Sequence, residues 1–468
     1  MSSASSAASP TSPTGAAPNG PDGAASPSGP PGPRRHDREI LALALPAFGA
    51  LVAEPLFLLA DSAMVGHLGT AQLAGLGVAA ALLTTVVNVF IFLAYATTAA
   101  VSRSLGAGDL HLALKRGLDG LWLALLLGLL LLLLALAAAP LLVDAFGASA
   151  TAAPYAVTYL RISALGVPAM LLVLAATGVL RGLQDTRTPL YVAVAGFAAN
   201  TALNALLIYG LDLGVAGSAW GTVLAQWGMA AAYLTVVLRG ARRHGAGLRP
   251  DPRGIRANAR AGVPLLIRTL SLRGILLLTT TVAARLGDTE VAAHQVALTI
   301  WTFLGFALDA IAIAGQAIIG RYLGAGDATA ARLLCRRMVW WGVLSGLVLG
   351  LLTAAGSPLL PRLFTGDAQV RDALLPVLFA IALTQPIAGA VFVLDGVLMG
   401  AGDGPYLAWA MLLTLAVFAP AALLVPALGG GVVALWWVFA GLMMATRLAT
   451  LAGRAAQGRW LVTGAVHG

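Results

Sequence analysis

The chain is poor in cysteine and in charged residues. Cys335 is the only cysteine among 468 residues, so no disulfide can form within the chain. Charged residues make up 10% of the sequence, against 59% hydrophobic residues and a mean hydropathy of +0.88. A water-soluble fold cannot bury so large an apolar fraction, so lipid must be the solvent for most of the chain.

Motifs of metal binding and catalysis are also missing. The six histidines are scattered without metal-ligand spacing, so we expect no metal site and no bound cofactor. The stretches 105–109 and 323–327 both read LGAGD, but neither continues into the GK[ST] of a phosphate loop. We interpret them as a glycine that ends one helix and an aspartate that caps the next. The chain also lacks the DDxxD motif of a prenyl transferase, and we expect no enzyme activity.

The formal net charge of +9 does not indicate a nucleic-acid partner. Most of the basic residues lie in short loops between apolar segments, which is the positive-inside pattern of a membrane protein. The sequence therefore predicts a lipid bilayer as the surroundings of the chain.

Twelve apolar segments follow a Ser-, Ala-, Pro- and Gly-rich tail, residues 1–38, which we expect to be disordered. An even number of membrane crossings places both termini on one side, and the loop arginines place that side in the cytoplasm. Heavy Arg, Ala, Leu and Gly usage favours a bacterial source, and hence a cytoplasmic (inner) membrane. The segments are residues 40–66, 71–101, 117–143, 152–180, 188–210, 213–239, 262–285, 290–319, 338–363, 370–399, 405–427 and 431–453.

Many residues of the first half of the chain recur in the second half at a fixed distance along the sequence. We call this distance, the difference in number between two corresponding residues, the repeat offset. Pro46 corresponds to Pro264, Arg103 to Arg321, and the first LGAGD stretch to the second. Repeats of six helices each share one orientation in the membrane, so a pseudo-twofold axis along the membrane normal should relate them. We predict an all-α membrane protein with an N-lobe at 39–240, a basic cytoplasmic loop at 241–261, a C-lobe at 262–455 and a cytoplasmic tail at 456–468.

Asp61 is the most informative single residue, because it lies within the first apolar segment. A carboxylate there costs roughly 2.5–3.5 kcal/mol on insertion scales and usually marks a functional site. Burial disfavours its charged form, so Asp61 is our candidate for proton coupling. Pro55 removes a helix hydrogen bond six residues earlier and is a candidate hinge. Glu54 lies on nearly the same helix face as Asp61 and is a candidate accessory proton site.

Several stretches together resemble the multidrug and toxic compound extrusion (MATE) transporters, in particular their DinF-like branch. The resemblance covers residues 40 to about 455 and implies the MATE/MOP fold, with two six-helix lobes in a V. It also implies the export of organic compounds against a proton or sodium gradient, by a monomer. The stretches are PLFLLADSAMVGHLG (55–69), RGLQDTRTP (181–189), IRTLSLRGILLLTTTVAARLG (267–287), AAHQV (292–296), ALDA (307–310) and FVLDGVLMG (392–400).

The resemblance assigns roles to further residues. Asp61 matches the first-helix carboxylate of the family, whose protonation is coupled to substrate release. Asn200 and Asn204 share one helix face that approaches this carboxylate in the family, although many prokaryotic members carry Asp where this chain has Asn204. Asp309 and Asp395 match carboxylates of the DinF-like branch.

Two arginines on the seventh segment require partners in the membrane. We predict that Arg268 or Arg273 pairs with Asp309 or Asp395, either as a substrate site or as a lock between helices. The seventh segment carries no Asp or Glu, whereas the NorM-like branch uses a carboxylate there for cation binding. This difference favours protons over sodium, although the hydroxyls of 279–281 remain possible sodium ligands.

The eighth segment adds two polar candidates, His294 and Gln316. A histidine in a membrane helix is either a hydrogen-bonded packing residue or a proton relay, and both interpretations stay open. Gln316 is a candidate cavity residue on the same segment.

The sequence therefore predicts a cation-coupled antiporter, with protons as the coupling ion, that exports small cationic or amphipathic organic compounds. The alternative is a flippase of lipid-linked oligosaccharides, but only Arg268 and Arg273 are available as cavity cations for a pyrophosphate group. A passive scaffold would leave the aspartates inside the membrane segments without a reason.

Overall fold

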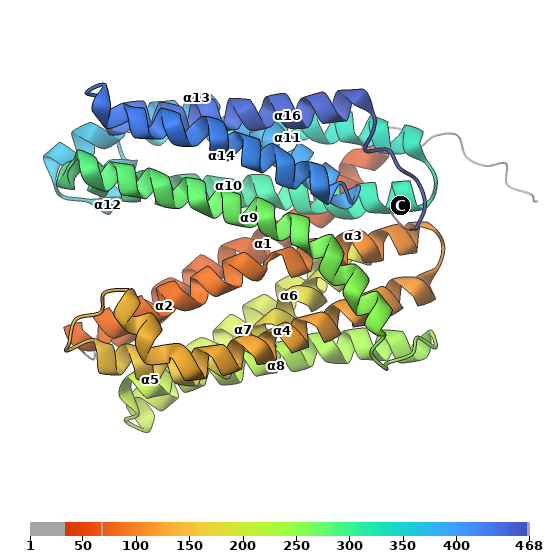
Figure 1. Ribbon diagram of the computed structural model, residues 1–468, viewed down its shortest axis with the longest axis horizontal. Coiled ribbons are helices and arrows are strands. Elements are labelled where there is room, and N and C mark those ends of the chain that lie inside the picture. Colours follow the sequence, from red (N-terminus) through yellow and green to blue (C-terminus); the bar gives the residue numbers. More distant parts are fainter. Residues whose placement is uncertain (1–32, 67–68, 466–468) are drawn as a thin grey trace, which may run out of the picture.

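The computed structural model describes residues 33–66 and 69–465, except for the side chains at 33–35, 54, 56–63 and 65–66. Every regular element in these ranges is a helix (Figure 1). The first lobe contains α1 (Pro33–Gly66), α2 (Thr70–Phe90), α3 (Phe92–Gly106), α4 (Leu110–Ala145), α5 (Ala153–Ala164), α6 (Val167–Gly182), α7 (Arg187–Ala205), η1 (Leu206–Gly210) and α8 (Gly214–Arg243). The second contains α9 (Pro252–Leu286), α10 (Asp288–Gly324), α11 (Ala328–Gly356), α12 (Leu360–Phe364), α13 (Ala368–Gly400), α14 (Gly404–Ala427), α15 (Val432–Trp436), η2 (Trp437–Met443) and α16 (Met444–Gln457).

These helices account for the twelve predicted segments. Ten helical spans in the described part of the chain are long and apolar enough to cross a membrane, and the pair α5–α6 makes an eleventh. The remaining predicted segment, 40–66, lies within α1. The all-α membrane fold predicted from composition is therefore confirmed.

The fourth predicted segment is not one straight helix. It breaks between α5 and α6, whose axes differ by 51°. Gly166 and Pro168 stand at the break, and the proline nitrogen cannot donate a hydrogen bond back into α5. The ninth segment also divides, because α11 ends at Gly356 and the short α12 begins at Leu360.

The connection between the lobes is shorter than the predicted basic loop at 241–261. Helix α8 continues to Arg243 and α9 begins at Pro252. Asp251 caps α9 by accepting a hydrogen bond from the Arg253 amide at 3.1 Å, and Pro252 occupies the first helical position, where proline is favoured.

The LGAGD stretches have the predicted structure in both lobes. The Asp109 side chain accepts a hydrogen bond from the Leu112 amide at 2.7 Å, and Asp327 accepts one from Ala330 at 2.8 Å. Gly108 and Gly326 have φ values of 80° and 81°, a conformation that favours glycine. Both loops are therefore helix connections rather than phosphate loops.

The two lobes repeat each other in their packing. A Cβ atom on Gly178 would lie 2.5 Å from the Ala94 carbonyl oxygen, and one on Gly396 would lie 2.3 Å from that of Ala312. The repeat offset relates both members of these pairs. The same helices therefore approach each other through the same glycine in each lobe.

The lobes meet at the end of the molecule that carries the two LGAGD loops, which we call the converging end. Figure 1 shows the lobes drawing together there, on the right, and spreading apart toward the left. A Cβ on Gly106 would lie 1.9 Å from the Arg321 carbonyl oxygen, and one on Gly324 would lie 2.0 Å from that of Arg103. The repeat offset relates Gly106 to Gly324 and Arg103 to Arg321, so the two contacts are symmetry equivalents of each other. The pseudo-twofold axis therefore passes between α3 and α10 at this point.

Helices α1 and α9 begin against the opposite lobe. At the start of α1, Asp37 forms an ion pair with Arg337 of α11 at 2.7 Å. At the start of α9, Asn258 donates a hydrogen bond to the Arg116 carbonyl of α4 at 3.1 Å. These two crossing helices join the lobes at the converging end.

Candidate functional site

The strongest cluster of buried charge surrounds Asp395 on α13. Arg268 of α9 forms a two-point ion pair with this carboxylate, and its Nε lies 3.1 Å from Oδ1. Arg447 of α16 donates a second charged hydrogen bond, Nη2 to Oδ2, at 3.1 Å. Asp395 and Arg447 are each 4% exposed. A buried pair of this kind fixes three helices of one lobe relative to each other.

The Arg268–Asp395 pair confirms one of the four pairings that the sequence left open. Arg273, on the same helix, is exposed. Arg447 was not predicted, although it lies inside the segment 431–453. The rule that an arginine in a membrane segment needs a carboxylate partner would have identified it.

Asp309 of α10 stands apart from this pair. It is half-buried and forms no ion pair with any side chain that the structure describes. Arg181 of α6 and Arg268 of α9 lie within electrostatic range of its carboxyl group. Asp309 therefore faces charges from both lobes, whereas the charge of Asp395 is already compensated within the second lobe.

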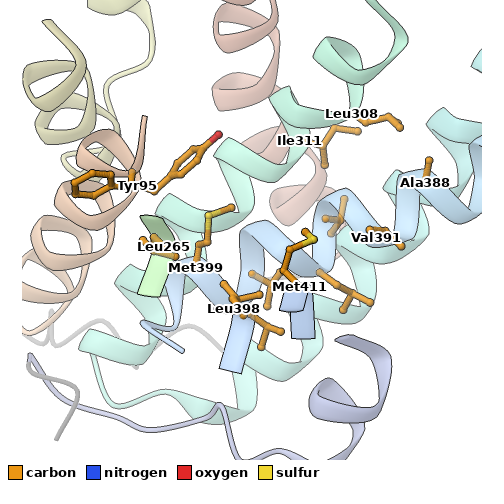
Figure 2. Close-up of a cluster of buried hydrophobic side chains, with 14 of the residues drawn as sticks. Tyr95, Leu265, Leu308, Ile311, Ala388, Val391, Leu398, Met399 and Met411 are labelled. Carbon is orange, nitrogen blue, oxygen red and sulfur yellow. The ribbon is translucent and has the colours of Figure 1, made fainter. Parts of the chain in front are cut away.

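Tyr95 of α3 is a first-lobe residue that packs against helices of the second lobe. Figure 2 shows its ring beside the hydrophobic cluster that includes Leu265 of α9 and Met399 of α13. The backbone carbonyl of Tyr95 accepts a hydrogen bond from Gln316 Nε2 of α10 at 2.7 Å. Gln316 is 1% exposed, so it acts as a hydrogen bond between the lobes rather than as part of an open cavity wall.

Asn200 and Asn204 are buried between α7 and α8. Asn204 Nδ2 donates to Asn200 Oδ1 at 2.9 Å, and Asn200 Nδ2 donates to Thr222 Oγ1 of α8 at 3.2 Å. Gly221 allows α8 to approach, because a Cβ there would lie 2.0 Å from Asn204 Oδ1. These contacts have the form of helix–helix hydrogen bonding within the first lobe.

His294 is fully buried inside the second lobe. Its Nε2 lies 3.0 Å from the Thr280 hydroxyl of α9, and its ring centroid lies 5.7 Å from that of Trp436. The hydroxyls of Thr279, Thr280 and Thr281 each donate to the carbonyl four residues earlier on their own helix. This arrangement has the form of a packed, hydrogen-bonded histidine.

The remaining predicted site residues lie on α1. The side chains of Asp61 and Glu54 lie outside the described residues. Helix α1 is assigned as one element from Pro33 to Gly66 and includes both Pro46 and Pro55. Its outer end is held by Tyr209 of η1, whose hydroxyl donates to the Met64 carbonyl at 2.6 Å. No group of three or more His, Cys, Asp or Glu residues that could hold a metal ion occurs among the described side chains.

Solved transporter structures share this fold. An outward-facing multidrug resistance MATE family transporter of the MOP superfamily has a TM-score of 0.83 at 21% identity, covering 91% of this chain and 96% of that one. The Vibrio cholerae MATE transporter VcmN in its bent form also has a TM-score of 0.83 at 21% identity, with 92% and 99% covered.

Sequence comparisons give the same result at higher identity. DNA damage-inducible protein F of Escherichia coli is 30% identical over 413 residues, which is 86% of this chain and 88% of that protein. Protein DETOXIFICATION 43 of Arabidopsis thaliana is 30% identical and covers 90% of both chains. A probable multidrug resistance protein NorM of Xanthomonas campestris is 30% identical over 77% of this chain and 81% of that protein.

The MatE family model matches the chain twice, at residues 46–206 and 264–424. The two matches begin at Pro46 and Pro264, so they are separated by the repeat offset. The chain thus belongs to the MATE family of multidrug and toxic compound efflux transporters, multi-pass membrane proteins that extrude organic compounds.

Proposed function

We propose that this protein is a proton-coupled antiporter that exports small cationic or amphipathic organic compounds across the bacterial inner membrane. The observation that carries the proposal is the meeting of two repeated lobes on a pseudo-twofold axis, with charged groups from both lobes near their contact. Two lobes that close at one end are what alternating access requires.

The positive-inside pattern supports one orientation of this structure. The converging end carries Arg103, Arg116, Arg321 and Arg337, which the loop charges assign to the cytoplasm. Under that assignment the described conformation is closed to the cytoplasm, with both termini on the cytoplasmic side.

Coupling is assigned to Asp61 on α1. An acidic group within an apolar segment favours its neutral form, so uptake of a proton from outside removes a charge and changes the helix's surroundings. Related structures include a straight and a bent conformation of a MATE transporter, and Pro55 gives α1 a position at which such a change can occur. Sodium is the less favoured ion, because α9 has no acidic residue.

Ethidium transport in oriented inside-out vesicles tests the proposal, with the pH and sodium gradients imposed separately. We expect uptake driven by the pH gradient in the wild type and a loss of that uptake in Asp61→Asn. Asp61→Glu, which keeps the carboxyl group, is the matched control and should retain part of the activity. Uptake that follows only the sodium gradient, or full activity of Asp61→Asn, would contradict proton coupling through this residue.

A further inference from the structure

Two arginines related by the internal repeat hold the lobes together. Arg103 lies on α3 of the first lobe, and its repeat counterpart Arg321 lies on α10 of the second. Arg321 forms an ion pair with Glu39 of α1. Arg103 binds Ala401 at the end of α13. Arg103 therefore binds the opposite lobe, and Arg321 binds the crossing helix α1, which continues into the first lobe.

The partners of Arg103 are all backbone carbonyl groups. Its Nη1 donates to Ala401 at 2.8 Å, its Nη2 to Val462 at 2.8 Å and its Nε to Gly464 at 3.1 Å. The residue is only 3% exposed, and it forms no ion pair with any described carboxylate. A buried cation needs such acceptors to offset the loss of water, so Arg103 depends on the carbonyl groups that surround it.

Two of these carbonyls belong to the C-terminal segment 460–465, which we call the strap. Trp460 anchors it with an indole that is 1% exposed and donates to the Ala455 carbonyl at 3.1 Å. The Gly464 amide donates to Leu323 of the second lobe at 3.0 Å, and Arg116 of the first lobe donates to the Ala465 carbonyl at 2.8 Å. The strap thus contacts both lobes across the converging end.

We propose that Arg103, Arg321 and the strap form a latch that holds the cytoplasmic end shut and must be released in each transport cycle. The inference rests on the orientation given under the proposed function. Opening toward the cytoplasm must separate α3 from α10, and Arg103 then exchanges the strap carbonyls for water. The strap contacts Arg103 through backbone carbonyls alone, so it can separate from Arg103 by the rupture of two hydrogen bonds.

The state of the latch can be read from one engineered cysteine. Cys335→Ser removes the only native thiol, and Ser102→Cys places a new one between the lobes. Ser102 is fully buried, and its Oγ would lie 2.0 Å from a Cβ atom on Gly320 of the opposite lobe. Opening of the converging end exposes this position, so its rate of reaction with an impermeant maleimide in inside-out vesicles reports the open fraction.

A stop codon after Leu461 removes the strap carbonyls and retains Trp460. Hydrogen bonds to a charged group are among the stronger ones, so we expect labelling at least about tenfold faster than in the full chain. A stop after Ala465 keeps every strap contact described above and should label at the full-chain rate. Arg103→Gln and Arg321→Gln, which leave the strap sequence intact, should each also accelerate labelling.

The two point variants decide the result if the truncated chain does not fold, as judged by size-exclusion chromatography. Unchanged labelling in Arg103→Gln and Arg321→Gln would overturn the latch, as would equal acceleration by both truncations. Labelling only from the other face of the membrane would overturn the orientation and leave the comparison between variants valid. Absence of drug transport by the wild type would refute the proposed function without affecting these rates.

Discussion

The buried aspartates of the second lobe differ in how far their charge is already compensated. Asp395 accepts hydrogen bonds from two guanidinium groups, Arg268 and Arg447, whereas Asp309 has no described ion-pair partner. A carboxylate that accepts hydrogen bonds from two guanidinium groups is held in one geometry. Asp395 is therefore suited to holding helices together, whereas Asp309 is not held by an ion pair of this kind.

Removal of the Asp395 charge should destabilise the second lobe. Asp395→Asn leaves Arg268 and Arg447 buried with one carboxylate fewer, and we expect a loss of about 3–5 kcal/mol of stability. Chemical denaturation in detergent, followed by circular dichroism, measures this loss. Asp309→Asn is the matched control and should change stability by less than about 1 kcal/mol. Equal losses in both variants would show that Asp395 is not the structural member of the pair.

Asp37 predicts a pH dependence at the start of α1. Hydrogen bonds from Arg337 and then from Trp341 lower the pKa of its carboxyl group from 3.8 to about 2. Because the pKa in the folded protein is lower, the contact stabilises the fold above pH 4 and loses its effect as the pH falls toward 2. The Tm difference between the wild type and Asp37→Asn should therefore be largest at pH 5 and shrink to zero near pH 2. A difference that stays constant over this range would contradict the assignment.

Residue-level prediction from the sequence succeeded where charge had to be compensated. The Arg268–Asp395 pair could be predicted because both charges lie in apolar segments. Arg103 could not be placed, since it lies just beyond the segment 71–101 and its acceptors are backbone carbonyls, which no residue type indicates. Gln316 was predicted as a cavity residue, whereas it is buried and donates a hydrogen bond to the Tyr95 backbone of the other lobe.

Helices cross at glycines in this protein, and the crossings recur in both halves. A Cβ atom on Gly182 of α6 would lie 3.0 Å from the Thr98 carbonyl oxygen of α3. A Cβ atom on Gly400 of α13 would lie 2.3 Å from the Gln316 carbonyl oxygen of α10. Without a hydrophobic driving force between helices in lipid, close backbone approach provides the attraction, and glycine permits it. The internal repeat therefore preserves contacts as well as residues.

Substitution of the glycines on the pseudo-twofold axis should disrupt the contact between the lobes. Gly106→Ala and Gly324→Ala each place a methyl group within 2.0 Å of a backbone oxygen, so we expect each to cost about 1–3 kcal/mol of thermal stability. Gly228→Ala on α8 is the matched control. Nothing lies within 4 Å of its Cβ position, and the change should be neutral or stabilising by up to about 1 kcal/mol. A melting curve of each variant decides between these outcomes.

Element boundaries followed from the sequence where caps and prolines mark them. The start of α9 at Asp251-Pro252 has both signals, yet the density of arginines in 241–261 favoured a loop. The bend between α5 and α6 was not predicted, because the run 152–180 was taken as one apolar segment long enough to cross the membrane. Gly166 next to Val167-Pro168 was the available signal.

The whole molecule consists of two lobes joined by the crossing helices α1 and α9 and by the converging end. The hydrogen bond from Gln184 of the first lobe to the Ala317 carbonyl of the second, at 2.9 Å, belongs to the same set of contacts. The repeat offset made this pairing of lobes predictable from the sequence. The conformation, closed at the converging end, was not predictable, because both states of a two-state transporter must be encoded by one sequence.

Reporter fusions test the orientation of the whole molecule. Green fluorescent protein fused after Gly468 should fluoresce, since it folds only on the cytoplasmic side. Alkaline phosphatase inserted at Gly366, in the connection between α12 and α13, should be active, since it requires the periplasm. The reverse pattern would invert the assignment of the converging end.

The segments that follow the last helix of each lobe differ in their contacts, although the repeat offset relates their positions. Position 462, where the strap supplies a carbonyl to Arg103, corresponds to position 244, where the first lobe must continue into the connection to α9. Arg321, the repeat counterpart of Arg103, binds the Glu39 carboxylate of α1 instead of backbone carbonyls. The two arginines therefore depend on partners of different chemistry, so salt should weaken the contact of Arg321 with a carboxylate more than that of Arg103 with carbonyl groups.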